Sequence, residues 1–89
     1  MEFQSIPSVV MEVVADVVKN ALGIDLQPGR EEPLLSSGLI DSVSLLDLLE
    51  RLSARAGFVV DPMEVTLENF DTVARIEAFT ELKLKGERK

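Results

Sequence analysis

Between Ser8 and Leu22, apolar residues recur in adjacent pairs every four positions, and the positions between the pairs are mostly polar. A strand would place polar residues at every second position, whereas this spacing draws one broad apolar stripe along a helix. Pro7 suits an early helical position, and Gly23 suits the position just past a helix end. We therefore predict a first helix that buries the pairs Val9-Val10, Val13-Val14, Val17-Val18 and Ala21-Leu22.

The segment 24–40 has no sustained period and contains Pro28, Gly29, Pro33 and the cluster Ser36-Ser37-Gly38. Such a composition indicates a long loop, and loops of this length in compact domains are usually functional or disordered. Several apolar residues within the segment favour an ordered loop that packs onto the core. These residues are Leu26, Leu34, Leu35, Leu39 and Ile40.

A second helix is predicted from Ser42 to Ala56. Asp41 suits its N-cap and Gly57 marks its end. At about 100° per residue, one arc of this helix is apolar and should face the core. That arc consists of Leu45, Leu48, Leu49, Leu52 and Ala56. Ser42, Val43 and Leu46 fall outside it, with Asp47 and Glu50 nearby.

The rest of the chain predicts shorter elements. An extended linker at 58–60 precedes Asp61 and Pro62, which suit the N-cap and first residue of a single-turn helix ending near Val65. A final helix is expected after Asp71, with its apolar positions inward and a frayed tail at 85–89. These positions are Val73, Ile76, Phe79 and Leu82. We expect one domain over residues 1–89, with its core at about 6–84.

The residue types exclude much site chemistry. The chain has no histidine and no cysteine, so it offers no imidazole base for a serine nucleophile, no disulfide and neither of the usual zinc ligands. No EF-hand spacing points to calcium. Asp47 and Glu50 form a carboxylate pair but lie in no predicted cleft, so an enzyme is not expected. Ser42 is thus a candidate for modification rather than catalysis.

Sixteen acidic and nine basic residues give a formal net charge of −7. This charge repels nucleic acid and anionic lipid surfaces, and it would steer the chain toward basic surfaces of other proteins. No apolar run approaches the roughly 20 residues that span a bilayer, and no secretory signal is evident. The expectation is a cytoplasmic monomer, although acidity that serves only solubility would give the same composition.

The motif Gly38-Leu39-Ile40-Asp41-Ser42-Val43, followed by Leu45-Leu46-Asp47-Leu48-Leu49, resembles the attachment motif of acyl and peptidyl carrier proteins. A second likeness lies in Gly57-Phe58 and in the segment 65–73, which look like the end of helix II, the short third helix and the start of the last helix in stand-alone carriers. The resemblance implies an all-α, four-helix bundle with three main helices, a short third helix and a long loop between helices I and II. It also implies that Ser42 receives 4′-phosphopantetheine from coenzyme A.

In carriers of this family, the thiol of the arm holds an acyl or aminoacyl group as a thioester. The resemblance implies three kinds of partner: a phosphopantetheinyl transferase, a loading ligase, and a downstream transferase or synthase. It also implies that Asp41 helps the phosphopantetheinyl transferase to recognise the site. Docking would use Val43 and Leu46 as apolar contacts, with Asp47 and Glu50 as charges for a basic partner. Met63, on the short third helix, is a weaker candidate.

Two departures from fatty-acid carriers argue against a fatty-acid synthase as the partner. Val43 stands where those carriers usually have Leu, and the predicted second helix includes Arg51 and Arg55 where theirs is more uniformly acidic. The segment 66–71 looks more like stand-alone carriers that serve dedicated ligases, including aminoacyl ligases.

One alternative is an unmodified, acidic helical module that binds a basic protein through Val43 and Leu46. Burial of these two side chains against the long loop or another helix is a further possibility, as is an ordinary solvated role for Asp47 and Glu50. The two functional hypotheses differ in whether the serine hydroxyl is required. Ser42→Ala would abolish the carrier function and would barely disturb the interaction module.

Overall fold

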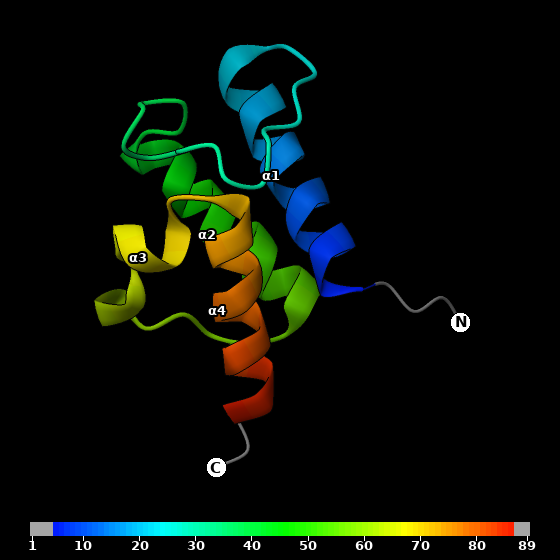
Figure 1. The fold of residues 1–89 in the computed structure, drawn as a ribbon, viewed down its shortest axis with the longest axis vertical. Coiled ribbons are helices and arrows are strands. Elements are labelled where there is room, and N and C mark those ends of the chain that lie inside the picture. The colour runs from blue at the N-terminus through cyan, green and yellow to red at the C-terminus, as the bar shows by residue number, and fades with distance from the viewer. Residues whose placement is uncertain (1–4, 87–89) are drawn as a thin grey trace.

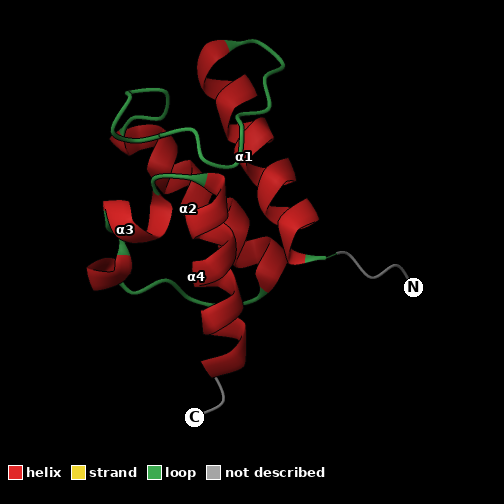
Figure 2. Cartoon of the chain, in the orientation of Figure 1, coloured by secondary structure: helices red, strands yellow, loops and turns green. Residues whose placement is uncertain are grey.

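The computed structural model describes residues 5–86, and within them the chain is helical with no strand (Figures 1 and 2). The elements in chain order are α1 (Ile6–Leu22), α2 (Ser42–Ala56), the 3-10 helix η1 (Pro62–Glu64), α3 (Leu67–Phe70) and α4 (Val73–Gly86). The predicted all-α, carrier-like helical bundle is therefore confirmed.

Helix α1 begins and ends as its sequence predicts. The Ser5 hydroxyl accepts a hydrogen bond from the Ser8 amide at 3.3 Å, and Pro7 lies in the first turn. Gly23 has a φ of 77° and donates its amide to the Lys19 carbonyl at 2.7 Å. Glycine adopts this left-handed conformation without the steric cost of a Cβ.

The valine stripe of α1 forms one side of the core, with five valines buried: Val10, Val13, Val14, Val17 and Val18. α1 packs against both α2 and α4. The prediction was wrong for the last pair, because Ala21 and Leu22 are exposed. They lie in the final turn of α1, which reaches the edge of the molecule in Figure 1.

The long loop crosses from the end of α1 over the start of α4 to the start of α2 (Figure 1). Leu34 and Ile40 are buried as predicted, and Leu35 and Leu39 pack partly against the core. The prediction was wrong for Leu26, which is exposed. The loop is first held to α4 at Arg30, whose carbonyl accepts the Ala74 amide at 3.0 Å, so Leu26 precedes this attachment.

Two short helices lie between α2 and α4. η1 confirms the single turn predicted after Asp61, and α3 lies within the segment 65–73, where the resemblance implied the short third helix. The Thr66 hydroxyl caps α3 by accepting the Asn69 amide at 3.3 Å, and Phe70 ends the helix fully buried. The Phe70 ring lies against that of Phe79 with centroids 5.0 Å apart, so α3 fastens this segment to α4.

In α4, Val73, Ile76 and Phe79 are buried as predicted, and Thr80 is buried as well. The prediction was wrong for Leu82, which is 69% exposed. The C-terminal turns of α4 extend beyond the other helices in Figure 1, so a residue on the inward stripe has little to pack against there. α4 continues through Lys85 and Gly86, which were expected in a frayed tail. The remainder of that tail lies outside the described residues.

Candidate functional site

The start of α2 carries the candidate site. Asp41 caps the helix: its Oδ1 accepts the Ser44 amide at 2.9 Å, and its carbonyl accepts the Leu45 amide at 2.8 Å. The hydrogen bond from the Ser44 backbone, reinforced by the Ser44 side chain, lowers the pKa of the Asp41 carboxyl below its ordinary value. Asp41 is therefore an anion at neutral pH, and its charge is directed at the first turn of α2.

Ser42 is the first residue of α2 and is exposed. No other group within residues 5–86 forms a hydrogen bond with its side chain. The whole chain contains no histidine that could act as a base beside this hydroxyl. The hydroxyl is accessible to another protein, and no group within the described residues activates it.

The apolar candidates flanking Ser42 face solvent. Val43 is 73% exposed and Leu46 is 63% exposed, so the alternative that they are buried is wrong. They are three residues apart on α2, a spacing that places two side chains on the same side of a helix. Met63, which is 87% exposed, comes from a separate element, η1.

The charges of α2 are less available than predicted. Asp47 is paired with Arg51 one turn later, at 2.9 Å, and it is partly buried. Arg55 is paired with Glu12 of α1, also at 2.9 Å. Glu50 is exposed. Of the two acids predicted to meet a basic partner, Glu50 is presented freely, whereas Asp47 is partly neutralised within the helix.

A buried carboxylate that was not among the predicted site residues holds the loop leading to Ser42. Asp71 accepts the amides of Leu35 and Ser36 at Oδ1, at 2.8 and 2.9 Å, and the Ser36 hydroxyl at Oδ2, at 2.8 Å. The hydrogen bond from the Ser36 amide is the main cause of a lowered pKa at the Asp71 carboxyl, although burial acts in the opposite direction and raises that pKa. From the sequence, Asp71 stood only as the residue before the last helix. The one sequence signal for this role is the position of the acid directly after Phe70, a residue that the structure buries.

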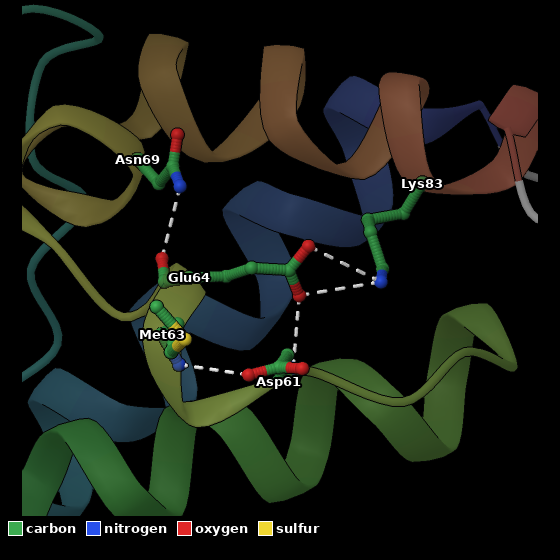
Figure 3. A network of polar contacts seen from close by, with 5 residues as sticks. All are labelled: Asp61, Met63, Glu64, Asn69 and Lys83. Atoms are coloured by element: carbon green, nitrogen blue, oxygen red, sulfur yellow. Dashed lines mark hydrogen bonds and ion pairs between the residues drawn. The ribbon is translucent and has the colours of Figure 1, made fainter.

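The element that carries Met63 is fixed by a polar network, shown in Figure 3. Asp61 accepts the Met63 amide at 2.9 Å, and Glu64 accepts the Asp61 amide at 2.8 Å, so the two acids cap η1 reciprocally. Lys83 of α4 pairs with Glu64 at 3.2 Å, and the Asn69 side chain donates to the Glu64 carbonyl at 2.9 Å. Met63 is thus an exposed side chain on a rigidly held turn.

The sequence profile described as "Phosphopantetheine attachment site" matches residues 12–80, a span that includes α2, η1 and α3. The chain belongs to this family. It is also similar to a D-alanyl carrier protein of Abiotrophia defectiva, with 35% identity over 69 residues that cover 78% of this chain and 77% of that protein. Membership makes this chain a carrier protein with a 4′-phosphopantetheine prosthetic group.

Carrier proteins are not themselves catalytic. The family implies interaction with a phosphopantetheinyl transferase and with loading and synthase enzymes. Among residues 5–86, no helix is long and apolar enough to cross a membrane, and no group of acidic side chains is arranged to hold a metal ion. The residues at the start of α2 fit the prosthetic group, because an exposed hydroxyl without internal hydrogen bonds is free to be esterified.

Proposed function

We propose that Ser42 is the residue that carries 4′-phosphopantetheine. The proposal rests on one observation: the Ser42 side chain is exposed at the first position of α2, directly after the Asp41 cap. Ser42 also lies inside the matched residues 12–80. The Ser42 oxygen would bond to the phosphorus of the pantetheine-bearing phosphate of coenzyme A. The bond from that phosphorus to the nucleotide would break, releasing adenosine 3′,5′-bisphosphate. The hydroxyl proton would pass to the transferase, because this chain has no histidine to accept it.

The start of α2 suits a phosphodiester. The first amides of a helix lack acceptors within the helix, and the positive end of the helix dipole favours a negative group there. Asp41 opposes this as a like charge, but its carboxylate is already engaged by the Ser44 amide. We therefore assign Asp41 two roles, to cap α2 and to mark the site for the transferase.

We propose an aminoacyl group as the cargo, held as a thioester on the thiol that the arm supplies. The likeness to a protein named as a D-alanyl carrier supports this class and makes D-alanine the first amino acid to test. The paired Asp47 and Arg51 also support it, because α2 lacks the uniformly acidic face of fatty-acid carriers. A tethered cargo reaches each docked enzyme at a high local concentration.

We propose that partners dock on the exposed side of α2, with Val43 and Leu46 as apolar contacts and Glu50 as the acid that meets a basic group. Met63 adds an apolar contact from η1. Asp47 contributes less, since Arg51 already pairs with it.

The test of the attachment site is intact mass spectrometry of the chain, before and after incubation with coenzyme A and a broad-specificity phosphopantetheinyl transferase. We expect a gain of one phosphopantetheinyl group in the wild type and in Ser53→Ala, a control at the other end of α2. We expect no gain in Ser42→Ala with unchanged helical circular dichroism. Modification of Ser42→Ala would refute the site, and an unmodified, folded wild type would favour the interaction module.

The cargo is tested by incubating the phosphopantetheinylated chain with ATP, D-alanine and an aminoacyl-loading ligase. We expect a further gain of one alanyl group, which hydroxylamine removes while the phosphodiester remains. Loading of a fatty acyl group in preference to alanine by matched ligases would contradict the aminoacyl assignment and leave the carrier function intact.

A further inference from the structure

The seven residues from Leu34 to Ile40 form a closed turn immediately before the Asp41 cap. The Ile40 amide donates to the Leu34 carbonyl at 2.9 Å, so the two ends of the turn meet. Inside it, the Gly38 amide donates to the Leu35 carbonyl at 3.1 Å. Leu34 and Ile40 are fully buried beneath. The turn therefore behaves as one unit whose placement decides where the chain enters α2.

The external polar hold on this turn comes from the junction between α3 and α4. The Asp71 carboxylate accepts its three hydrogen bonds from Leu35 and Ser36, and the Asp71 carbonyl accepts the Leu34 amide at 2.6 Å. Asp71 is 8% exposed, so the carboxylate end of these bonds is sheltered from water, while Ser36 itself lies at the surface. Hydrogen bonds to an ionised acceptor are among the stronger ones, and shelter from water strengthens them further.

Two more contacts bind the preceding part of the loop to the start of α4. The Ala74 amide donates to the Arg30 carbonyl, and the Arg30 side chain pairs with Glu77. Ala74 and Glu77 are spaced three residues apart, which puts them on one side of the start of α4, and Asp71 lies just before that helix begins. The loop is thus docked along that side, and Asp71 holds the point nearest in sequence to Ser42.

We infer that Asp71 is a positioning residue for the modification of Ser42, acting through the turn 34–40 rather than by touching the reacting atoms. This inference rests on the proposed attachment at Ser42. A transferase that reaches the first turn of α2 must also accommodate the residues directly before it. A mobile turn would present Asp41 and Ser42 in many orientations, and each encounter would then be productive less often.

The test is a kinetic comparison of Asp71→Ala, Asp71→Asn and Ser36→Ala as substrates of the transferase. We expect Asp71→Ala to raise the KM for the carrier by about 10-fold with little change in kcat, less than the roughly 100-fold cost of a misplacement of about 1 Å at a reacting centre. Asp71→Asn keeps a side-chain oxygen that can accept the amides of Leu35 and Ser36. Ser36→Ala removes the hydroxyl but leaves the hydrogen bonds from both amides to Asp71 in place. Both should therefore have smaller effects than Asp71→Ala.

A second readout separates positioning from general stability. Hydrogen exchange should speed up at the amides of Leu34, Leu35 and Ser36 in Asp71→Ala and stay slow in the middle of α1. Val17→Ala is the matched control, because it removes buried apolar surface from α1 and leaves every hydrogen bond between Asp71 and the loop in place. We expect Val17→Ala to lower the free energy of unfolding and leave the KM unchanged.

An unchanged KM in Asp71→Ala would overturn the inference, and so would an equal rise in Val17→Ala. If Asp71→Ala does not fold, Asp71→Asn and Ser36→Ala replace it in the kinetic comparison. A KM that stays at the wild-type value in both variants would then overturn the inference. Failure of the proposed function looks different, because the wild-type chain itself would then gain no mass. In that case the exchange measurement still shows whether Asp71 holds the turn.

Discussion

The two sides of α2 differ in what their leucines do. Leu48 and Leu52 are buried in the core. Leu46, only two residues before Leu48, is 63% exposed, and Val43 is 73% exposed. Helix α1 contrasts with this, since its apolar stripe is buried apart from the half-buried Val9 and the exposed final turn. Helix α1 is therefore a scaffold, whereas α2 holds the fold with one side and presents Ser42 beside apolar side chains on the other.

Single exposed apolar residues are common on protein surfaces and need no explanation alone. Val43 and Leu46 gain meaning from their place beside an exposed serine at the start of a helix, in a chain that belongs to the phosphopantetheine attachment family. If the comparison is right, truncating one side of α2 should change stability, and truncating the other should change recognition.

The largest effect is expected on the core side. Leu48 is 1% exposed, so Leu48→Ala removes buried apolar atoms and leaves a cavity, with a loss of about 2–5 kcal/mol in the free energy of unfolding. Urea denaturation followed by helical circular dichroism measures it. Leu46→Ala is the matched control on the same helix and should stay within about 0.5 kcal/mol of the wild type. Equal losses in the two variants would mean that Leu46 supports the fold as much as Leu48 does.

The exposed side should respond in the opposite way. Leu46→Ala should lower kcat/KM for loading by the cognate ligase by about 10-fold, which corresponds to about 1.4 kcal/mol of lost contact. The measurement is the rate of thioester formation at limiting carrier concentration. Leu82→Ala serves as a control, because Leu82 is as exposed as Leu46 but lies on α4. A similar fall in both variants would mean that exposed leucines act without regard to place.

The sequence predicted the two long helices well because each combines a period with end signals. For α2, an acid before Ser42 and a glycine after Ala56 give both ends, and the structure has the same bounds. Helix α3 has only four residues, too few for a period, so only the resemblance of the segment 65–73 to carrier proteins indicated a helix there. Periodicity also overestimated burial at Leu82, since it shows which side of a helix is apolar and cannot show where the neighbouring elements stop.

At the site, the exposure of Val43 and Leu46 could be anticipated from their angle on the helix, and the structure confirms it. The hold of Asp71 on Leu35 and Ser36 could not, because it joins residues about 36 positions apart. Sequence patterns report local periods and caps, whereas such a contact depends on how the loop crosses α4. Likewise, the pairing of Asp47 with Arg51 reduced a charge that the sequence had counted as available.

A smaller effect should appear in acid, away from both sides of α2. The pKa of Asp71 is lowered in the folded chain, mainly by the Ser36 amide, so its contribution to stability is fully present above the unfolded value of about 3.9. That contribution is lost as the pH falls from about 4 through the lowered pKa, because the unfolded chain then binds a proton that the folded chain does not. Asp71→Asn should flatten this part of the stability profile.

Thermal melts of the wild type and Asp71→Asn from pH 6 to pH 2, at about one-unit steps, measure the difference. The gap between the two midpoints should be widest near neutral pH and should narrow in acid. Asp41, whose pKa is also lowered, keeps its own contribution in both proteins. A gap that stays constant with pH would mean that the charge of Asp71 adds nothing to the hold on the loop.

The smallest effect concerns the charges of α2. Arg51→Gln breaks the pair with Asp47, and since both side chains are partly exposed the loss should be only about 0.3–0.5 kcal/mol. It also frees an acid beside the side of α2 that we propose for docking, so association with a basic partner should become faster and more sensitive to salt. Arg75→Gln makes the same change in net charge on α4. If both variants speed association equally, the total charge of the chain steers its partners; if Arg51→Gln alone does so, the exposed side of α2 is where they arrive.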